Sequence, residues 1–111
     1  MSPASAGGKS SVSVTAWNAC YNGDDGIIAL SCTVSVNLGG ISAVGMLLNN
    51  AEGMTLASSY VELSANSESV TPALNLPPGD LKVGDSVTGV VSGEADGQHY
   101  FFEQELTIGN C

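Results

Sequence analysis

The sequence contains no arginine, and its cationic side chains are limited to Lys9 and Lys82 beside a single histidine, His99. Eleven carboxylates outnumber them and give a formal net charge of -9 over 111 residues. A surface so poor in ammonium and guanidinium groups cannot neutralise a row of phosphates. The composition therefore argues against nucleic acid and anionic lipid as partners.

Long apolar runs are also lacking. Hydrophobic residues make up 43% of the chain, but no stretch approaches the roughly 18 apolar residues that a membrane helix needs. Membrane insertion is therefore not expected. The first residues, "MSPASAGGKSS", have no apolar segment of the kind found in a signal peptide. They predict a flexible polar tail over residues 1–10, or a start that replaces a removed signal, before a single domain over residues 11–111.

No window shows the three-and-four spacing of apolar residues that a helix requires. Turn-forming sequences recur instead, at intervals that suit short strands. They are "NGDDG", "GG", "NNAEG", "ANSES", "PPGD", "GEADG" and "GN". The spacing predicts an all-β protein.

Residues 28–38 alternate between apolar and polar side chains, which is typical of a strand with one buried face. The same pattern before the "NGDDG" turn predicts a hairpin of residues 11–20 and 27–38 around Asp24 and Asp25. Further strands are expected at 44–48, 61–63, 70–76, 86–92 and 98–108. The residues expected in the core are Leu30, Cys32, Val34, Val36, Phe102, Leu106 and Ile108.

Seven or eight short strands without a helix favour an antiparallel two-sheet β-sandwich of immunoglobulin-like architecture over a closed barrel. The likeness is one of architecture only. Immunoglobulin domains place a tryptophan between two cysteines, whereas Trp17 precedes both Cys20 and Cys32.

The three cysteines are too far apart in sequence for a zinc or redox motif, and one histidine is too few for a blue copper site. The hairpin places Cys20 opposite Ala29, about 10 Å along the strand from Cys32. The first and last strands of many sandwiches run parallel as neighbours, which would bring Cys20 close to Cys111. We therefore predict a Cys20–Cys111 disulfide and a buried, free Cys32.

Two acidic loops gather carboxylates among glycines. Calcium prefers several such oxygens together with backbone carbonyls, although neither loop matches an EF-hand. The simpler interpretation is that Asp-Gly pairs serve the geometry of tight turns. If calcium binds, the candidate ligands are Asp24, Asp25, Glu94 and Asp96.

The last strand is expected to place His99, Phe101 and Glu103 on its outer face. If the first strand lies beside it, Trp17 joins them in an exposed aromatic patch suited to a sugar ring or a protein partner. The alternative is that a bulge shifts the alternation in the first strand and Trp17 belongs to the core.

No catalytic constellation is present in the sequence. It has one histidine, no activated nucleophile motif and no glycine-rich phosphate loop, and the Glu103 and Glu105 pair is expected on the solvated face. The prediction is a non-enzymatic structural or interaction module, secreted or on a cell or virion surface, of a filament, adhesin or virion-type assembly. Its expected partners are other proteins or further copies of itself. The alternatives are a carbohydrate- or calcium-binding sandwich and, for the compartment, the cytoplasm.

Overall fold

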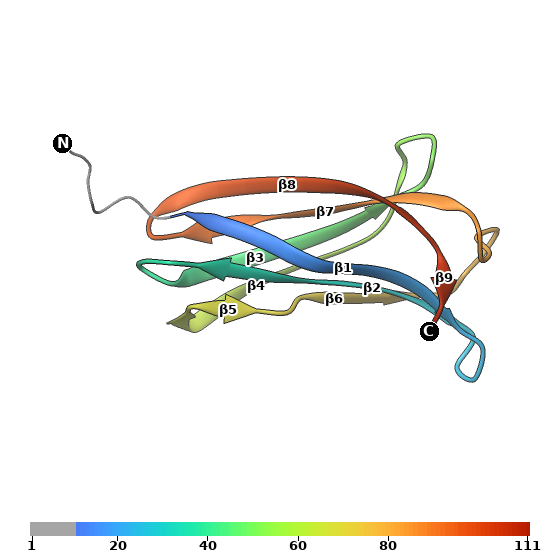
Figure 1. Ribbon diagram of the computed structural model, residues 1–111, viewed down its shortest axis with the longest axis horizontal. Helices are drawn as coiled ribbons and strands as arrows, with labels where there is room; N and C mark the ends of the chain where they lie inside the picture. The colour runs from blue at the N-terminus through green and yellow to red at the C-terminus, as the bar shows by residue number, and fades with distance from the viewer. Residues whose placement is uncertain (1–10) are drawn as a thin grey trace.

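The computed structural model describes residues 11–111; residues 1–10, for which a polar tail is predicted, lie outside the described residues. All regular structure within residues 11–111 is β-strand (Figure 1). This part of the chain has no helix long and apolar enough to cross a membrane. The strands are β1 (Val12–Asn22), β2 (Ile27–Val36), β3 (Ile41–Asn49), β4 (Thr55–Ser67), β5 (Ser69–Val70), β6 (Ala73–Leu76), β7 (Ser86–Ala95), β8 (Gln98–Thr107) and β9 (Gly109–Asn110).

The strands form two sheets, which confirms the predicted all-β class and fits a β-sandwich. The first sheet has the order β5-β2-β1-β9, with β6 also paired to β2, and the second has the order β4-β3-β7-β8. The buried apolar side chains of both sheets meet in one cluster between them. Each sheet therefore has one inner face toward this cluster and one outer face.

The hairpin of β1 and β2 has the predicted register, with Cys20 opposite Ala29. Asp24 donates its backbone N–H to Oδ1 of Asn22 at 3.0 Å within the turn, which Gly26 completes with a φ of 68°. The even-numbered residues of β2 are all buried, as the alternation predicts: Ile28, Leu30, Cys32, Val34 and Val36.

Two of the expected core residues, Phe102 and Leu106, are less buried than predicted. Ile108 is buried, but Phe102 and Leu106 are only partly buried, although both pack against the core. Their strand, β8, is an edge of the second sheet. An edge strand is covered on one side only, so its inward side chains keep contact with water.

Nine strand segments are present in residues 11–111, where seven or eight were predicted. β5 and β6 both pair with β2 and are separated by Thr71 and Pro72, because proline has no N–H to donate to a ladder. β9 continues β8 after Ile108 but leaves the second sheet to pair in parallel with β1. Cys20 lies opposite Gly109 in that pairing, so the predicted parallel placement of the first and last strands is confirmed.

Candidate interaction surface

The outer face of the second sheet carries a row of four residues from four strands. Gly45 of β3 pairs with Tyr60 of β4 on one side and with Ser92 of β7 on the other. Ser92 in turn pairs with Phe101 of β8. Residues directly opposite each other in a sheet point to the same face, so this aromatic row consists of Tyr60, Gly45, Ser92 and Phe101.

Tyr60 and Phe101 are the two most exposed aromatic side chains of the described residues, at 63% and 64% exposed. The strands that carry them are separated by three inter-strand steps, or about 14 Å. Between them Gly45 has no side chain and Ser92 has a small one. The Tyr60 ring lies over Gly45, where a Cβ would come within 3.3 Å of its Cδ1. Both rings line one shallow hollow, whose floor includes Ser92 and Gly93.

Further apolar side chains extend this face. Leu47 of β3 and Val90 of β7 pair with each other in the next row of the sheet. Val90 is only 3% exposed but does not belong to the core cluster between the sheets, which agrees with its outward position in the strand. The aromatic row thus borders an apolar centre rather than a uniformly polar surface.

Carboxylates surround the apolar centre. Glu94 pairs with His99 across β7 and β8, and its Oε2 lies 3.5 Å from Nε2 of His99. Glu62, exposed at the β4 edge, lies in the same row, which runs through Ala43. Glu103, in the row of Leu47 and Val90, is exposed on β8. The surface therefore combines exposed rings, an apolar centre and negative charge.

Three of the predicted ligand-binding residues lie together on this face. His99, Phe101 and Glu103 occupy alternate positions of β8, and all three are exposed. Sequence reasoning did not include Tyr60 in the patch. Tyr60 directly precedes the strand expected at 61–63, but its place in one row with Phe101 depends on the order of four strands.

The fourth, Trp17, does not join them. A bulge between Thr15 and Asn18 adds one residue to β1, and Ala16 there has a φ of 57°. The extra residue reverses the alternation and turns Trp17 to the inner face, where it packs against the core. A Cβ on Gly89 would lie 2.6 Å from Cζ3 of Trp17. The alternative of a bulge that places Trp17 at the core is therefore confirmed. The joint patch of Trp17 and Phe101 is wrong, because the two rings lie on opposite faces of the second sheet.

The two acidic loops lie at opposite ends of the molecule. Figure 1 shows the β1–β2 turn and the β7–β8 turn at opposite ends of the molecule. The β1–β2 turn contains Asp24 and Asp25, whereas Glu94 lies near the end of β7 and Asp96 lies in the β7–β8 turn. Asp25 accepts a hydrogen bond from Nδ2 of Asn22 at 3.3 Å. No group of three or more His, Cys, Asp or Glu side chains within residues 11–111 is placed to hold a metal ion. The four residues cannot form one site, and calcium binding at either loop stays a prediction.

The cysteines have the predicted arrangement. Cys20 and Cys111 form a disulfide with a Cα–Cα distance of 5.0 Å, which is ordinary for such a bond. Cys32 is free and fully buried. Burial raises the pKa of its thiol from 9.0 to about 11, so it has little of the thiolate character that a reactive cysteine needs.

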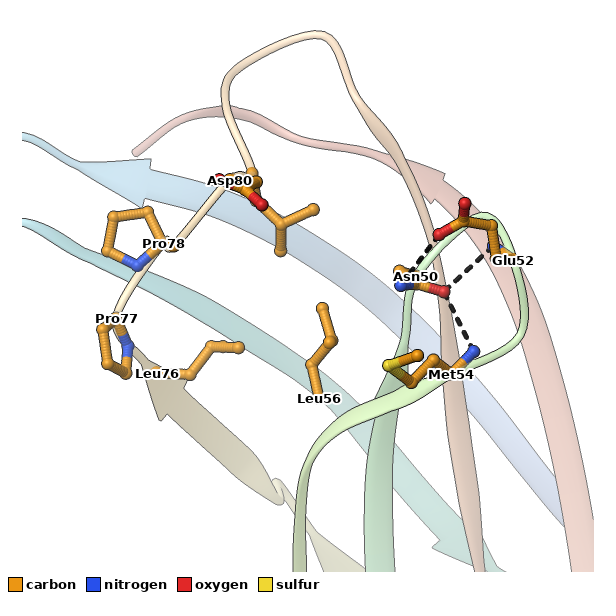
Figure 2. A pocket seen from close by; sticks show the side chains of 10 residues that line it. Asn50, Glu52, Met54, Leu56, Leu76, Pro77, Pro78 and Asp80 are labelled. Atoms are coloured by element: carbon orange, nitrogen blue, oxygen red, sulfur yellow. Dashed lines mark hydrogen bonds between the residues drawn. The ribbon is translucent and has the colours of Figure 1, made fainter.

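A second hollow, of about 480 Å³, lies at one end of the sandwich between the β3–β4 turn and the loop after β6 (Figure 2). Its walls include Leu56, Leu76 and Leu81. Asn50 has its side chain committed to the turn itself, because Oδ1 accepts from the N–H groups of Glu52 and Met54 at 2.9 Å each. This hollow thus combines an apolar wall with the carboxylates of Glu52 and Asp80, and none of its described lining residues is aromatic.

A scan against models of known protein families finds no match, and no curated protein matches the chain in sequence. Function is therefore inferred from the chemistry of the surface alone.

Proposed function

We propose that this protein is a non-enzymatic, extracellular interaction module that binds a protein partner through the outer face of its second sheet. The observation that carries the proposal is the aromatic row, with Tyr60 and Phe101 exposed across two small residues. Exposed apolar patches with polar rims are typical of interaction sites. Aromatic residues are enriched in interfaces because they bring large apolar area with few rotatable bonds.

A second copy of the chain is a poor candidate for that partner. The outer face carries Glu62, Glu94 and Glu103, and the whole chain has a net charge of -9. Two such faces brought together would repel each other. Of the two kinds of partner predicted from the sequence, the surface thus favours a different protein over self-assembly.

The strand order supports an immunoglobulin-like architecture. In variable-type immunoglobulin domains one sheet contains strands G, F and C together with the additional strand C′. The second sheet here has the corresponding order, β4-β3-β7-β8, and the first sheet pairs β1 with β2 and β2 with the β5–β6 edge. Such sandwiches are common scaffolds of cell-surface recognition domains.

The disulfide supports the extracellular part of the proposal. Disulfides persist in oxidising compartments and are rare in the cytosol. The Cys20–Cys111 bond is compatible with an extracellular location. The acidic surface, with its pI of about 4.1, suits a protein that stays in solution without binding nucleic acid.

Selection from a random peptide display library tests the proposal. Peptides that bind the immobilised wild-type protein should lose about tenfold or more in affinity for the Tyr60→Ser, Phe101→Ser double variant. Met54→Ser is the matched control, because Met54 is equally exposed at 62% but lies in the β3–β4 loop. Affinity for this variant should not change.

Two outcomes would contradict the proposal. Peptides that bind the double variant as tightly as the wild type would place the interaction surface elsewhere. A failure to select any peptide, combined with binding of a neutral oligosaccharide that depends on the same two rings, would favour the carbohydrate alternative.

A further inference from the structure

We propose that the hollow between Tyr60 and Phe101 binds a cationic side chain, arginine above all, presented by a different protein. This proposal rests on the proposed function, since it names the chemistry that the outer face recognises. It depends on three features: two exposed rings, a floor without bulk and a carboxylate at one end.

The rings and the floor define the shape of the site. Tyr60 and Phe101 line the hollow from the two edge strands, while Ser92 and Gly93 form part of its floor. A side chain at Gly93 would meet the hydroxyl of Tyr100 at 2.7 Å, so the close packing beneath the floor requires glycine. A planar guanidinium group can lie against an aromatic face and is attracted by the negative charge of the ring surface.

The carboxylate gives the site its charge preference. Glu94 lines the same hollow, its side chain 45% exposed, and its present neighbour is His99. A guanidinium group between the rings could donate two hydrogen bonds to this carboxylate. Glu62 and Glu103 in the adjacent rows add to the negative potential. An anionic or neutral side chain would gain none of this attraction.

The chain itself offers few cationic side chains as ligands. It has no arginine, and its two lysines are Lys82, in the loop between β6 and β7, and Lys9, outside the described residues. A second copy would thus bring carboxylates to a face already rich in them. Charge complementarity points to a partner of opposite composition, with arginine or lysine projecting from an apolar surface.

A matched pair of peptides tests the inference. One peptide has the sequence GSRSRSG, and the other replaces each arginine by citrulline, which keeps the shape and loses the charge. We expect the arginine peptide to shift the amide NMR signals of Ser92, Gly93 and Phe101 in the ¹⁵N-labelled protein. The citrulline peptide should bind about tenfold or more weakly.

Substitutions on both sides of the site provide the controls. Glu94→Gln and Phe101→Ser should each weaken the arginine peptide several-fold. Glu68→Gln removes an equal charge at an exposed position between β4 and β5, away from the aromatic row, and should change the affinity little. Melting curves of all variants verify that each is folded.

The outcomes separate this inference from the proposed function. Equal binding of both peptides, or an equal loss in Glu94→Gln and Glu68→Gln, would overturn the cationic site. If library peptides still require Tyr60 and Phe101 for binding in that case, the proposed function of the outer face is retained. If the arginine peptide binds no better than the citrulline peptide, and library peptides bind the Tyr60→Ser, Phe101→Ser variant as tightly as the wild type, both proposals are overturned.

Discussion

Ala16 is the residue at which the first strand changes the face that it presents to the core. A positive φ is uncommon outside glycine, and a bulge is one of the places where it occurs. The consequence of the bulge at Ala16 is that the following side chain, Trp17, fills space above Gly89 on β7. The absence of a side chain at Gly89 is thus a packing requirement of Trp17.

Gly89→Ala tests this contact. The added methyl group would approach the Trp17 ring to 2.6 Å and Cδ1 of Leu30 to 3.2 Å, so the core must shift. We expect a loss of about 1–3 kcal/mol in the free energy of unfolding, measured by urea titration. Gly23→Ala is the control, because the nearest atom to its Cβ is 3.8 Å away. Equal stability of both variants would show that Trp17 does not occupy this space.

Cys32 and Tyr100 make the fold sensitive to alkali. Burial raises the pKa of Cys32 from 9.0 to about 11. Burial, followed by the negative charges of ionised Cys32 and Tyr60, raises the pKa of Tyr100 from 10.0 to about 12. Tyr100 also donates its hydroxyl proton to the carbonyl of Ala43 at 3.0 Å. Both groups are therefore neutral in the folded protein at pH values where the unfolded chain ionises.

The contribution of these two groups to the free energy of unfolding should thus be constant below pH 9 and fall as the pH rises from 9 to 12. The unfolded chain loses these protons first, so rising pH favours it. For Cys32 alone the loss is on the order of 2–3 kcal/mol. Urea titrations across this range should show a flatter dependence in Cys32→Ala than in the wild type. Parallel curves for the two proteins would mean that Cys32 is not shielded.

At the scale of strands, the end of the chain is held by a change of sheet. β8 belongs to the second sheet, and β9 pairs with β1 of the first over two residues only. Ile108, which joins β8 to β9, is buried, and its N–H donates to the carbonyl of Asp85 at 2.9 Å. The Cys20–Cys111 disulfide fixes this short pairing.

Removal of the disulfide should destabilise the fold without changing the strands. The bond joins residues 91 positions apart, and a loop of that length corresponds to about 4.6 kcal/mol in the chain-entropy model. The Cys20→Ser, Cys111→Ser variant should unfold at lower urea than the wild type and be insensitive to a reductant. Alkylation of the oxidised wild type in denaturant should modify only Cys32. Three modified cysteines by mass spectrometry would contradict the bond.

Much of the strand arrangement could be predicted because it depends on local patterns. Alternation over residues 28–36 fixes the buried face of β2, and the "NGDDG" turn fixes its register with β1. That register separates Cys20 from Cys32, which is why Cys111 could be predicted as the disulfide partner of Cys20. A bulge in the first strand was one of two alternatives, but its position could not be foreseen, because nothing in the sequence around Ala16 marks a positive φ. The pairing of Tyr60 with Phe101 through β3 and β7 was equally hidden, since the order of strands in a sheet is set by contacts distant in sequence.

For the molecule as a whole, charge and surface shape act together. The exposed rings alone would favour association with any apolar surface, including another copy. The surrounding carboxylates and the net charge of -9 oppose association between copies. On the proposed function, this face is free in solution and is available to a different, cationic protein.

Light scattering over a range of protein concentrations tests that claim most directly. We predict a monomer of 11.2 kDa at every concentration, at low and moderate ionic strength, for the wild type and for Tyr60→Ser, Phe101→Ser alike. A wild-type dimer that disappears in the double variant would contradict it, because the aromatic row would then be covered by a second copy of the chain.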